Sequence, residues 1–281
     1  MLDELLRRHW RVTGRILALG GGMNSNTWLV STGSGRLVAK AVPAEAGEQL
    51  AAGLAVAAAV DAAGVPAGAA LRTVDARLVV RHAGQAVALL RYVGGRPLTD
   101  ADQPLIGATL ASVHRAAGAA SVPPSRRLAD WIDVAAPHLG LEPWLRPAVR
   151  DALAAYRNLP TLTHGLLHGD PAPEAFRYDG VRCGLIDWPA ALAGPLLYDL
   201  ASAVMYVGGP ERAGALLSGY AAGGVLAAEE LTWLPVLLRL RFAVQADYFA
   251  RRTAAGDLTG IDGPDGNAKG LADARRALTG R

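Results

Sequence analysis

Two carboxylates lie in this chain at a spacing that suits phosphoryl transfer. Asp170 follows His168 and Gly169 after an apolar run, and Asp187 comes seventeen residues later, at the end of a second short apolar run. A hairpin between them would bring both carboxylates to one cleft. There one could orient an acceptor hydroxyl while the other holds Mg2+ on nucleotide phosphates. Each aspartate alone would be uninformative, because His-Gly-Asp is a common tripeptide and aspartates are common in turns.

A lysine at position 40 is the third candidate. Lys40 and Lys269 are the only lysines among the 28 basic residues, so arginine occupies every other basic position. A lysine kept in this background indicates a place where a compact ammonium cannot be exchanged for a planar guanidinium, such as a contact with the α- and β-phosphates of a nucleotide. The alternative is a strand-end lysine that extends its ammonium into solvent. The aspartate motifs favour the phosphate contact.

Four short motifs follow one another along the chain: LVAK at 37–40, HGD at 168–170, IDW at 186–188 and LYDLA at 197–201. Their combination resembles the aminoglycoside phosphotransferase and choline kinase-like superfamily, a branch of the protein kinase-like fold, and the resemblance covers nearly the whole chain. It implies an ATP-dependent O-phosphotransferase that uses Mg2+. The acceptor would be a hydroxyl of a small molecule such as an aminoglycoside-like antibiotic, an amino alcohol or a sugar.

The implied fold is α+β and bilobal. A small antiparallel β-sheet would form the N-terminal nucleotide-binding lobe, residues 1–93, and a mostly helical C-terminal lobe, residues 94–281, would hold the catalytic and acceptor sites. Alternating apolar residues predict strands within 15–40 and at 77–81 and 86–93. Helical spacing and composition predict helices at 1–10, 44–63, 103–117, 128–138, 145–158 and 229–255.

The resemblance assigns contacts with ATP to the first lobe. Lys40 would touch the phosphates and pair with a glutamate of the following helix, for which Glu45 and Glu48 are candidates and Glu48 is preferred. A glutamate in a first helical turn is also simply favourable to the helix dipole, which is the alternative explanation. The backbone around the expected hinge would hydrogen-bond the adenine edge; the hinge residues are Arg91, Tyr92 and Val93.

A turn rich in Gly, Ser and Asn precedes Lys40 by one strand. It spans 20–26, and its backbone N–H groups, including those of Ser25 and Asn26, could approach phosphate oxygens closely. A Gly-rich hairpin turn is a weak signal by itself, and its position before Lys40 is what gives it value.

In the second lobe the resemblance assigns Asp170 to the acceptor hydroxyl and Asp187 to Mg2+. Asp199, in LYDLA, would support the catalytic loop by accepting backbone N–H bonds. His168 fits a loop organiser better than a base. His114 lies on an apolar helical face, where a histidine is more often a core residue than a catalyst, and we assign it no chemistry.

The chain departs from the family motif at one position. Many members have HGDLHPGN, and alignment on His168 gives HGDPAPEA, so the metal-binding Asn is replaced by Ala175 after Glu174. Alanine offers no oxygen to a metal. Three explanations follow: Glu174 supplies the ligand, which suits a hard cation; one well-held metal suffices; or the chain is a nucleotide- or ligand-binding pseudokinase with little activity.

The acceptor site is harder to locate. Polar residues gather in the segment QADYFARRTAAGDLTGIDGPDG, where Gln245, Asp247 and Tyr248 could bind an amine-bearing alcohol, with further aspartates at 257, 262 and 265. A solvated helix face that leads into a Gly-Pro loop is the alternative explanation.

Composition excludes several classes of protein. The net charge is +3 without a clustered basic stripe, which argues against a nucleic-acid partner. No apolar run is long enough for a bilayer and the N-terminus lacks the apolar stretch of a signal peptide, so we expect a cytoplasmic protein without a membrane partner. The lone Cys183 cannot form an internal disulfide, and its strand position favours packing.

Overall fold

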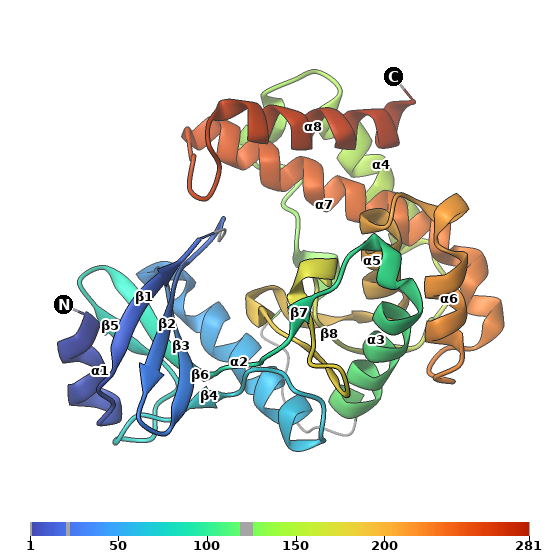
Figure 1. Cartoon of the computed structure of the whole chain (residues 1–281). Helices are drawn as coiled ribbons and strands as arrows, with labels where there is room; N and C mark the ends of the chain where they lie inside the picture. The colour runs from blue at the N-terminus through green and yellow to red at the C-terminus, as the bar shows by residue number, and fades with distance from the viewer. Residues whose placement is uncertain (1, 21–22, 119–125, 281) are drawn as a thin grey trace.

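The computed structural model describes residues 2–20, 23–118 and 126–280. It has two lobes that lie side by side, with the N-terminal sheet on one side and the helical part on the other (Figure 1). This is the α+β, bilobal kinase-like arrangement expected from the sequence. No helix of the described residues is long and apolar enough to cross a membrane.

The N-terminal lobe is built on an antiparallel sheet in the order β1-β2-β3-β6-β4, with β5 paired to β6. Its strands are β1 (Arg15–Leu19), β2 (Asn26–Thr32), β3 (Gly35–Pro43), β4 (Ala70–Leu71), β5 (Val80–His82) and β6 (Gln85–Arg91). The period-two alternation of β3 and β6 sends apolar side chains to both faces. One face packs on α1 (Leu2–Trp10), and the other packs on α2 (Gly47–Ala62).

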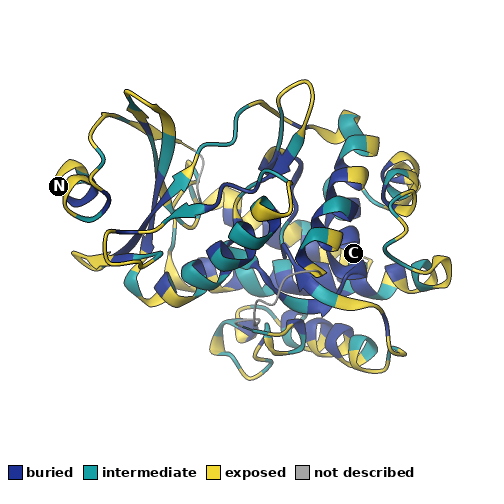
Figure 2. Ribbon diagram, turned by 90° about the horizontal axis from the view of Figure 1, so that it is seen from below, coloured by how far each residue is buried: buried dark blue, intermediate teal, exposed yellow. Residues whose placement is uncertain are grey.

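The C-terminal lobe packs its helices around one large core. Its helices are α3 (Gln103–Gly118), α4 (Leu145–Arg157), α5 (Leu197–Tyr206), α6 (Gly214–Ala221), α7 (Leu234–Ala255) and α8 (Pro264–Thr279). Helix α5 is buried along nearly its whole length. The helical lobe as a whole has its buried, dark blue ribbon on the inside and exposed, yellow ribbon at its rim (Figure 2). The core therefore fixes α5 as the platform on which the catalytic loop can rest.

Short strands carry the motif residues at the junction of the lobes. They are β7 (Arg96–Pro97), β8 (His164–Leu167), β9 (Phe176–Tyr178), β10 (Cys183–Leu185) and β11 (Leu192–Pro195). Strands β9 and β10 form the hairpin predicted between Asp170 and Asp187, and β11 pairs with β8. Strand β7 follows the hinge and pairs with β9. The connection between the lobes is therefore hydrogen-bonded to the same hairpin.

Two predicted helices are wrong in extent. Residues 128–138 form only a short 3-10 turn at Leu128–Asp130 and another that begins at Pro137. Asp133 accepts a hydrogen bond from the backbone of Ala135, and Pro137 has no N–H to donate, so local bonds replace the helical ladder. The segment 229–255 begins with a 3-10 turn, and α7 proper starts only at Leu234 with a proline in its first turn.

Candidate active site

Asp199 holds the HGD loop in place. Its side chain is fully buried on α5. Its two carboxylate oxygens accept the backbone N–H groups of His168 and Gly169 at 2.7 and 2.8 Å. The ring of His114 also contacts it, Nε2 to Oδ2 at 3.1 Å, while Nδ1 of that ring meets the hydroxyl of Tyr220 at 2.7 Å. The structure thus has Asp199 as the expected loop support and His114 as a buried, fully hydrogen-bonded core residue.

The HGD loop is packed tightly against the IDW segment. Gly169 has a φ of +88°, and a Cβ there would lie 2.2 Å from the carbonyl oxygen of Ala190, so only glycine fits. His168 contacts the carbonyl of Ile186 through Nε2 at 3.0 Å, and its ring packs edge-on to that of Trp188. A carbonyl only accepts, so Nε2 carries the hydrogen. His168 therefore organises the loop, as predicted, and ties Asp170 to Asp187.

Asp187 lies where β10 ends and pairs with Lys40. Its backbone is in the left-handed region, with φ of +76°, a conformation that aspartate tolerates and that often marks functional sites. Its side chain is 58% exposed, yet enough protein surrounds it for burial to oppose ionisation. The charge of Lys40 and the hydrogen bond from it outweigh burial and hold the pKa of Asp187 below its usual value. Two residues to which the sequence analysis gave separate roles, Lys40 and Asp187, thus form an ion pair.

The predicted pairing of Lys40 with Glu48 is wrong. The Lys40 ammonium bonds Asp187, whereas Glu48 is exposed on α2 and its carboxylate lies 3.8 Å from Arg81. The face of α2 that meets the site carries Gln49 instead, whose amide donates to the carbonyl of Pro189 at 2.9 Å. Gly53, one turn later, lets the helix approach Trp188. Helix α2 therefore braces the segment after Asp187 rather than supplying a carboxylate to the lysine.

Two residues that the sequence analysis missed hold Asp170. Oδ1 of its carboxylate accepts from the hydroxyl of Tyr206 at 2.6 Å and from Nη2 of Arg241 at 2.9 Å. Arg241 is buried in α7, and its Nε donates to Ser202 at 2.9 Å. Burial raises the pKa of the Tyr206 phenol, which therefore stays protonated as a donor. Both donors use one oxygen, and the carboxylate is 48% exposed, so its other oxygen can face an acceptor.

The candidate metal ligands are few. Within the described residues, no three His, Cys, Asp or Glu side chains are grouped as a metal site. Glu174 is exposed, and its charge acts on Tyr206, which places it on the Asp170 side. Ala175 is buried, and its carbonyl accepts from the backbone of Ile186 at 3.0 Å. This set still suits Mg2+, which often takes one or two protein carboxylates and draws its other ligands from phosphates and water.

The expected hinge presents a free backbone edge. Strand β6 ends at Arg91, whose N–H already bonds the carbonyl of Ala69 at 3.0 Å. No described residue hydrogen-bonds the backbone of Tyr92 or Val93. Of the residues 91–93 predicted to contact adenine, Arg91 therefore has no free backbone N–H. The N–H groups left to donate to adenine are those of Tyr92 and Val93.

The Gly-rich turn is fastened to the C-terminal lobe. The hydroxyl of Tyr248 donates to Oδ1 of Asn24 at 2.9 Å, and Arg252 donates to the carbonyl of Met23 at 2.9 Å. We call these two contacts the loop clasp. Figure 1 shows the tip of the β1–β2 hairpin reaching toward the end of α7. Ser25 is half-buried beside the clasp and Asn26 begins β2, while residues 21–22 of the turn lie outside the described part of the chain.

The predicted acceptor residues on α7 have other partners. Asp247 meets Nε2 of His138 at 2.7 Å, and Gln245 donates to the carbonyl of Gly270 on α8 at 3.0 Å. Tyr248 belongs to the loop clasp. The three side chains hold the C-terminal lobe and the turn together, so their assignment to acceptor binding is not supported by this geometry. They are neighbours in sequence, but the helix turns them toward different elements.

Exchange of Lys40 for arginine tests the lysine assignment. Lys40 is 8% exposed between the strands and Asp187, so the larger, planar guanidinium cannot place one donor where the ammonium lies. We expect Lys40→Arg to lower turnover of Mg-ATP by about 10²-fold, the scale of one lost transition-state donor. Steady-state kinetics provide the measurement, and wild-type turnover would show that a positive charge alone suffices.

Comparisons with known structures agree with this geometry at the level of fold. An amicoumacin kinase in complex with AMP-PNP, Ca2+ and amicoumacin is similar with a TM-score of 0.71 and 14% identity, over 94% of this chain and 87% of that one. A spectinomycin phosphotransferase with ADP and spectinomycin has a TM-score of 0.67 and 14% identity, over 99% and 97%. A choline/ethanolamine kinase family protein from Mesorhizobium loti has 0.64 and 19%, over 95% and 89%.

A search among curated proteins found no match. A family model, however, matches residues 15–234, a stretch that contains Lys40, the HGD loop and Asp187. The resemblance noted from the four motifs is thereby confirmed, and the chain belongs to the phosphotransferase enzyme family.

Proposed function

We propose that this protein transfers the γ-phosphoryl group of ATP to a hydroxyl of a small molecule. The observation that carries the proposal is the joint placement of Asp170 and Asp187, whose loops are tied together through His168 and Ile186. The carboxylate of Asp170 is held by two hydrogen-bond donors and keeps an exposed oxygen. The carboxylate of Asp187 pairs with Lys40 of β3. A pure binding protein has no need of an acceptor-orienting carboxylate.

The reaction rests mainly on positioning and charge. The exposed oxygen of Asp170 would accept a hydrogen bond from the acceptor hydroxyl and take its proton late in the transfer. Arg241 and Tyr206 hold this carboxylate in its orientation through hydrogen bonds to Oδ1. Lys40 would leave its pair with Asp187 partly or wholly to contact phosphate oxygens, because both partners then gain new counter-charges.

Asp187 would hold the magnesium ion, with Glu174 as a second ligand. The metal, when bound, would neutralise negative charge on the transferring phosphate oxygens. The N-terminal lobe, residues 1–93, would carry the nucleotide, with Tyr92 and Val93 at the adenine and the turn of Ser25 and Asn26 at the phosphates. The C-terminal lobe, residues 94–281, would carry the acceptor. Dependence on ATP fits a cytoplasmic location.

Charge near Asp170 favours a neutral or anionic acceptor over a polycation. Asp247 is engaged by His138, and Asp257 pairs with Arg252 at 3.0 Å, so neither stands free to hold an amine. Burial raises the pKa of Tyr198; the charges of Arg241 and Arg126 act in the opposite direction and those of Asp170 and Asp199 act with burial, so both signs of charge lie near this ring. Arg126 also stacks over Trp131 at 4.4 Å. Arginine with aromatic rings suits sugars or acidic alcohols.

The test is phosphorylation of a matched panel by the full-length protein. Initial rates with Mg-ATP are compared for neutral sugars, hydroxy acids, amino alcohols and aminoglycosides, and products are identified by mass spectrometry. We expect transfer to a neutral or acidic alcohol, with Asp170→Asn as the inactive control. Calorimetry with Mg-AMP-PNP is run in parallel, because nucleotide binding without transfer to any acceptor is the result expected of a pseudokinase.

Metal dependence tests the departure from the family motif. If Glu174 is the second ligand, its replacement by alanine should raise the Mg2+ concentration for half-maximal activity by about tenfold, and Ala175→Asn in the same chain should partly restore it. Titration of activity with Mg2+ at fixed ATP measures this. An unchanged dependence would assign the metal to Asp187 and the phosphates alone.

A further inference from the structure

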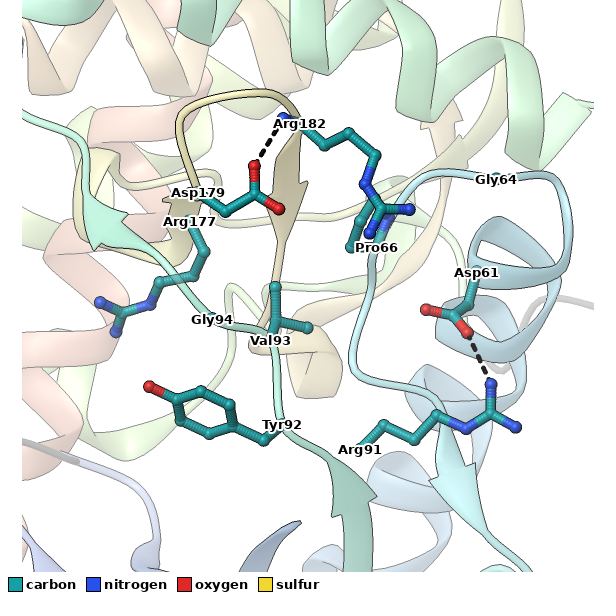
Figure 3. A pocket seen from close by; sticks show the side chains of 10 residues that line it. All are labelled: Asp61, Gly64, Pro66, Arg91, Tyr92, Val93, Gly94, Arg177, Asp179 and Arg182. Carbon is teal, nitrogen blue, oxygen red and sulfur yellow. Dashed lines mark hydrogen bonds and ion pairs between the residues drawn. The ribbon is translucent and has the colours of Figure 1, made fainter. Parts of the chain in front are cut away.

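Two adjoining cavities lie beside the hinge, at the junction of α2, the hinge and the β9–β10 hairpin. The first has a volume of about 290 Å³ and is lined by the C-terminal end of α2, the hinge residues Arg91–Gly94 and the hairpin (Figure 3). The second, of about 240 Å³, is lined by Val65, Leu105, Ala108 and Cys183 among others. Gly64, Pro66 and Arg182 line both. Because they share these lining residues, we call the two cavities together the hinge groove.

One half of the hinge groove is lined by three guanidinium groups, those of Arg91, Arg177 and Arg182, and by the two carboxylates of Asp61 and Asp179. Asp61 meets Arg91 at 3.3 Å and accepts from the backbone of Ala67. Asp179 accepts the backbone N–H groups of Arg182 and Val181, and these bonds together with the charge of the Arg182 side chain hold its pKa below the usual value. Among the described residues, no side chain forms a hydrogen bond or a close ion pair with the guanidinium group of Arg177, which is half-buried, or with that of Arg182, which is exposed. Figure 3 shows Arg182 extended along this cavity, with Arg91 turned to Asp61.

The other half of the groove is mainly apolar, although the hydroxyl residues Thr109 and Ser112 also line it. Val65 and Leu105 are partly buried against the main core, and the Cys183 thiol is half-buried on β10. Burial raises the pKa of this thiol, as expected for a wall of low polarity. Arg182, the neighbour of Cys183, stands between the apolar half and the charged half. A guanidinium at the mouth of an apolar cavity suits a ligand with an anionic head and a hydrocarbon chain.

We propose that the hinge groove is a second binding site, which takes a small amphipathic anion with a phosphate or carboxylate head on a short apolar chain. The head pairs with Arg182, assisted by Arg177, and the chain fills the cavity walled by Leu105, Ala108 and Cys183. Both lobes line the groove, because Pro66 precedes strand β4 of the sheet and Arg182 belongs to the β9–β10 hairpin. The two parts are hydrogen-bonded here, since the backbone N–H of Leu185 donates to the carbonyl of Pro66 at 2.9 Å. Its occupant bridges the two lobes outside the catalytic loop.

The experiment uses decyl phosphate below its micellar concentration and the full-length protein saturated with Mg-AMP-PNP, so that the head group cannot report on the nucleotide site. Binding is measured by calorimetry and by the rate at which maleimide alkylates Cys183, the only cysteine of the chain. We expect saturable binding and about tenfold slower alkylation. Decanoate should act likewise, whereas decanol and inorganic phosphate, each with half of the required chemistry, should bind at least about tenfold more weakly.

Variants separate the two halves of the groove. Arg182→Gln should weaken decyl phosphate binding about tenfold, and Ala108→Trp, at an exposed position of α3, should block the apolar half to a similar extent. Arg150→Gln, an exposed arginine of α4, is the matched control and should bind as the wild type does. No saturable binding, or binding that Arg182→Gln leaves unchanged, would overturn the proposal. Neither result bears on ATP binding or transfer, which are measured separately.

Discussion

Asp170→Asn is expected to lower phosphoryl transfer by about 10²- to 10⁴-fold while Mg-nucleotide affinity stays within about twofold of the wild type. The amide oxygen of asparagine can still accept from Tyr206 and Arg241, so the side chain should keep its place. What is lost is the second carboxylate oxygen, which orients the acceptor hydroxyl and receives its proton. Single-turnover transfer and calorimetry with Mg-AMP-PNP measure the two quantities.

A folded-state control accompanies this variant, because Arg241 is buried and loses its counter-charge. Arg241→Lys keeps a cation beside Asp170 but loses the hydrogen bond that Arg241 donates to Ser202. It therefore tests whether the orientation of the Asp170 carboxylate matters, whereas Asp170→Asn tests whether the carboxylate itself is needed. Turnover of Asp170→Asn within about tenfold of the wild type would remove the carboxylate from the mechanism. Melting temperatures of both variants show whether a loss of activity reflects unfolding.

Asp199→Ala is expected to have the largest effect on stability. It would leave three buried donors without an acceptor: the N–H groups of His168 and Gly169 and the ring of His114. A buried donor without a partner costs about 1–3 kcal/mol, so we expect the free energy of unfolding to fall by roughly 3 kcal/mol or more. Urea denaturation measures the change. Activity should fall as well, since the HGD loop loses its support.

Asp262→Ala is the matched control for this loss, because Asp262 is exposed and should change the free energy of unfolding by no more than about 0.5 kcal/mol. A change of the same small size in Asp199→Ala would show that water or a rearranged loop satisfies the three donors.

Much of the architecture was predictable because it is coded locally. The strand alternation of β3 and β6, the Ala-rich α2 and the hairpin between the aspartates follow from patterns within short windows of sequence. The roles of Asp199 and His168 in the loop were expected from the family motif, and the structure has them as hydrogen-bonded supports. The helix predicted at 128–138 is wrong because a proline and hydrogen bonds between a side chain and the local backbone compete with the helix. The spacing of apolar residues gives no sign of that competition.

The parts that could not be predicted depend on distant packing. Arg241 reaches Asp170 from 71 residues away, and nothing in LLRLRF marks it out from the other arginines of the chain. Glu48 was preferred over Glu45, and Gln49 was not considered, because the rotation of α2 that turns Gln49 to the site is set by Gly53 and the close approach of Trp188. Asp247 has a carboxylate of the kind that binds amines, but the fold places His138 beside it.

The loop clasp has a consequence for how the protein exchanges its nucleotide. Arg252 is 2% exposed and is itself fixed by Asn267 of α8 and by the carbonyl of Thr259. Helices α7 and α8 therefore hold, through the loop clasp, the turn that would cover the phosphates. The two lobes are joined by the hinge on one side and by the loop clasp on the other. If the turn covers the nucleotide as proposed, we expect nucleotide release to require opening of the loop clasp, whose residues on α7 and α8 lie outside every catalytic motif.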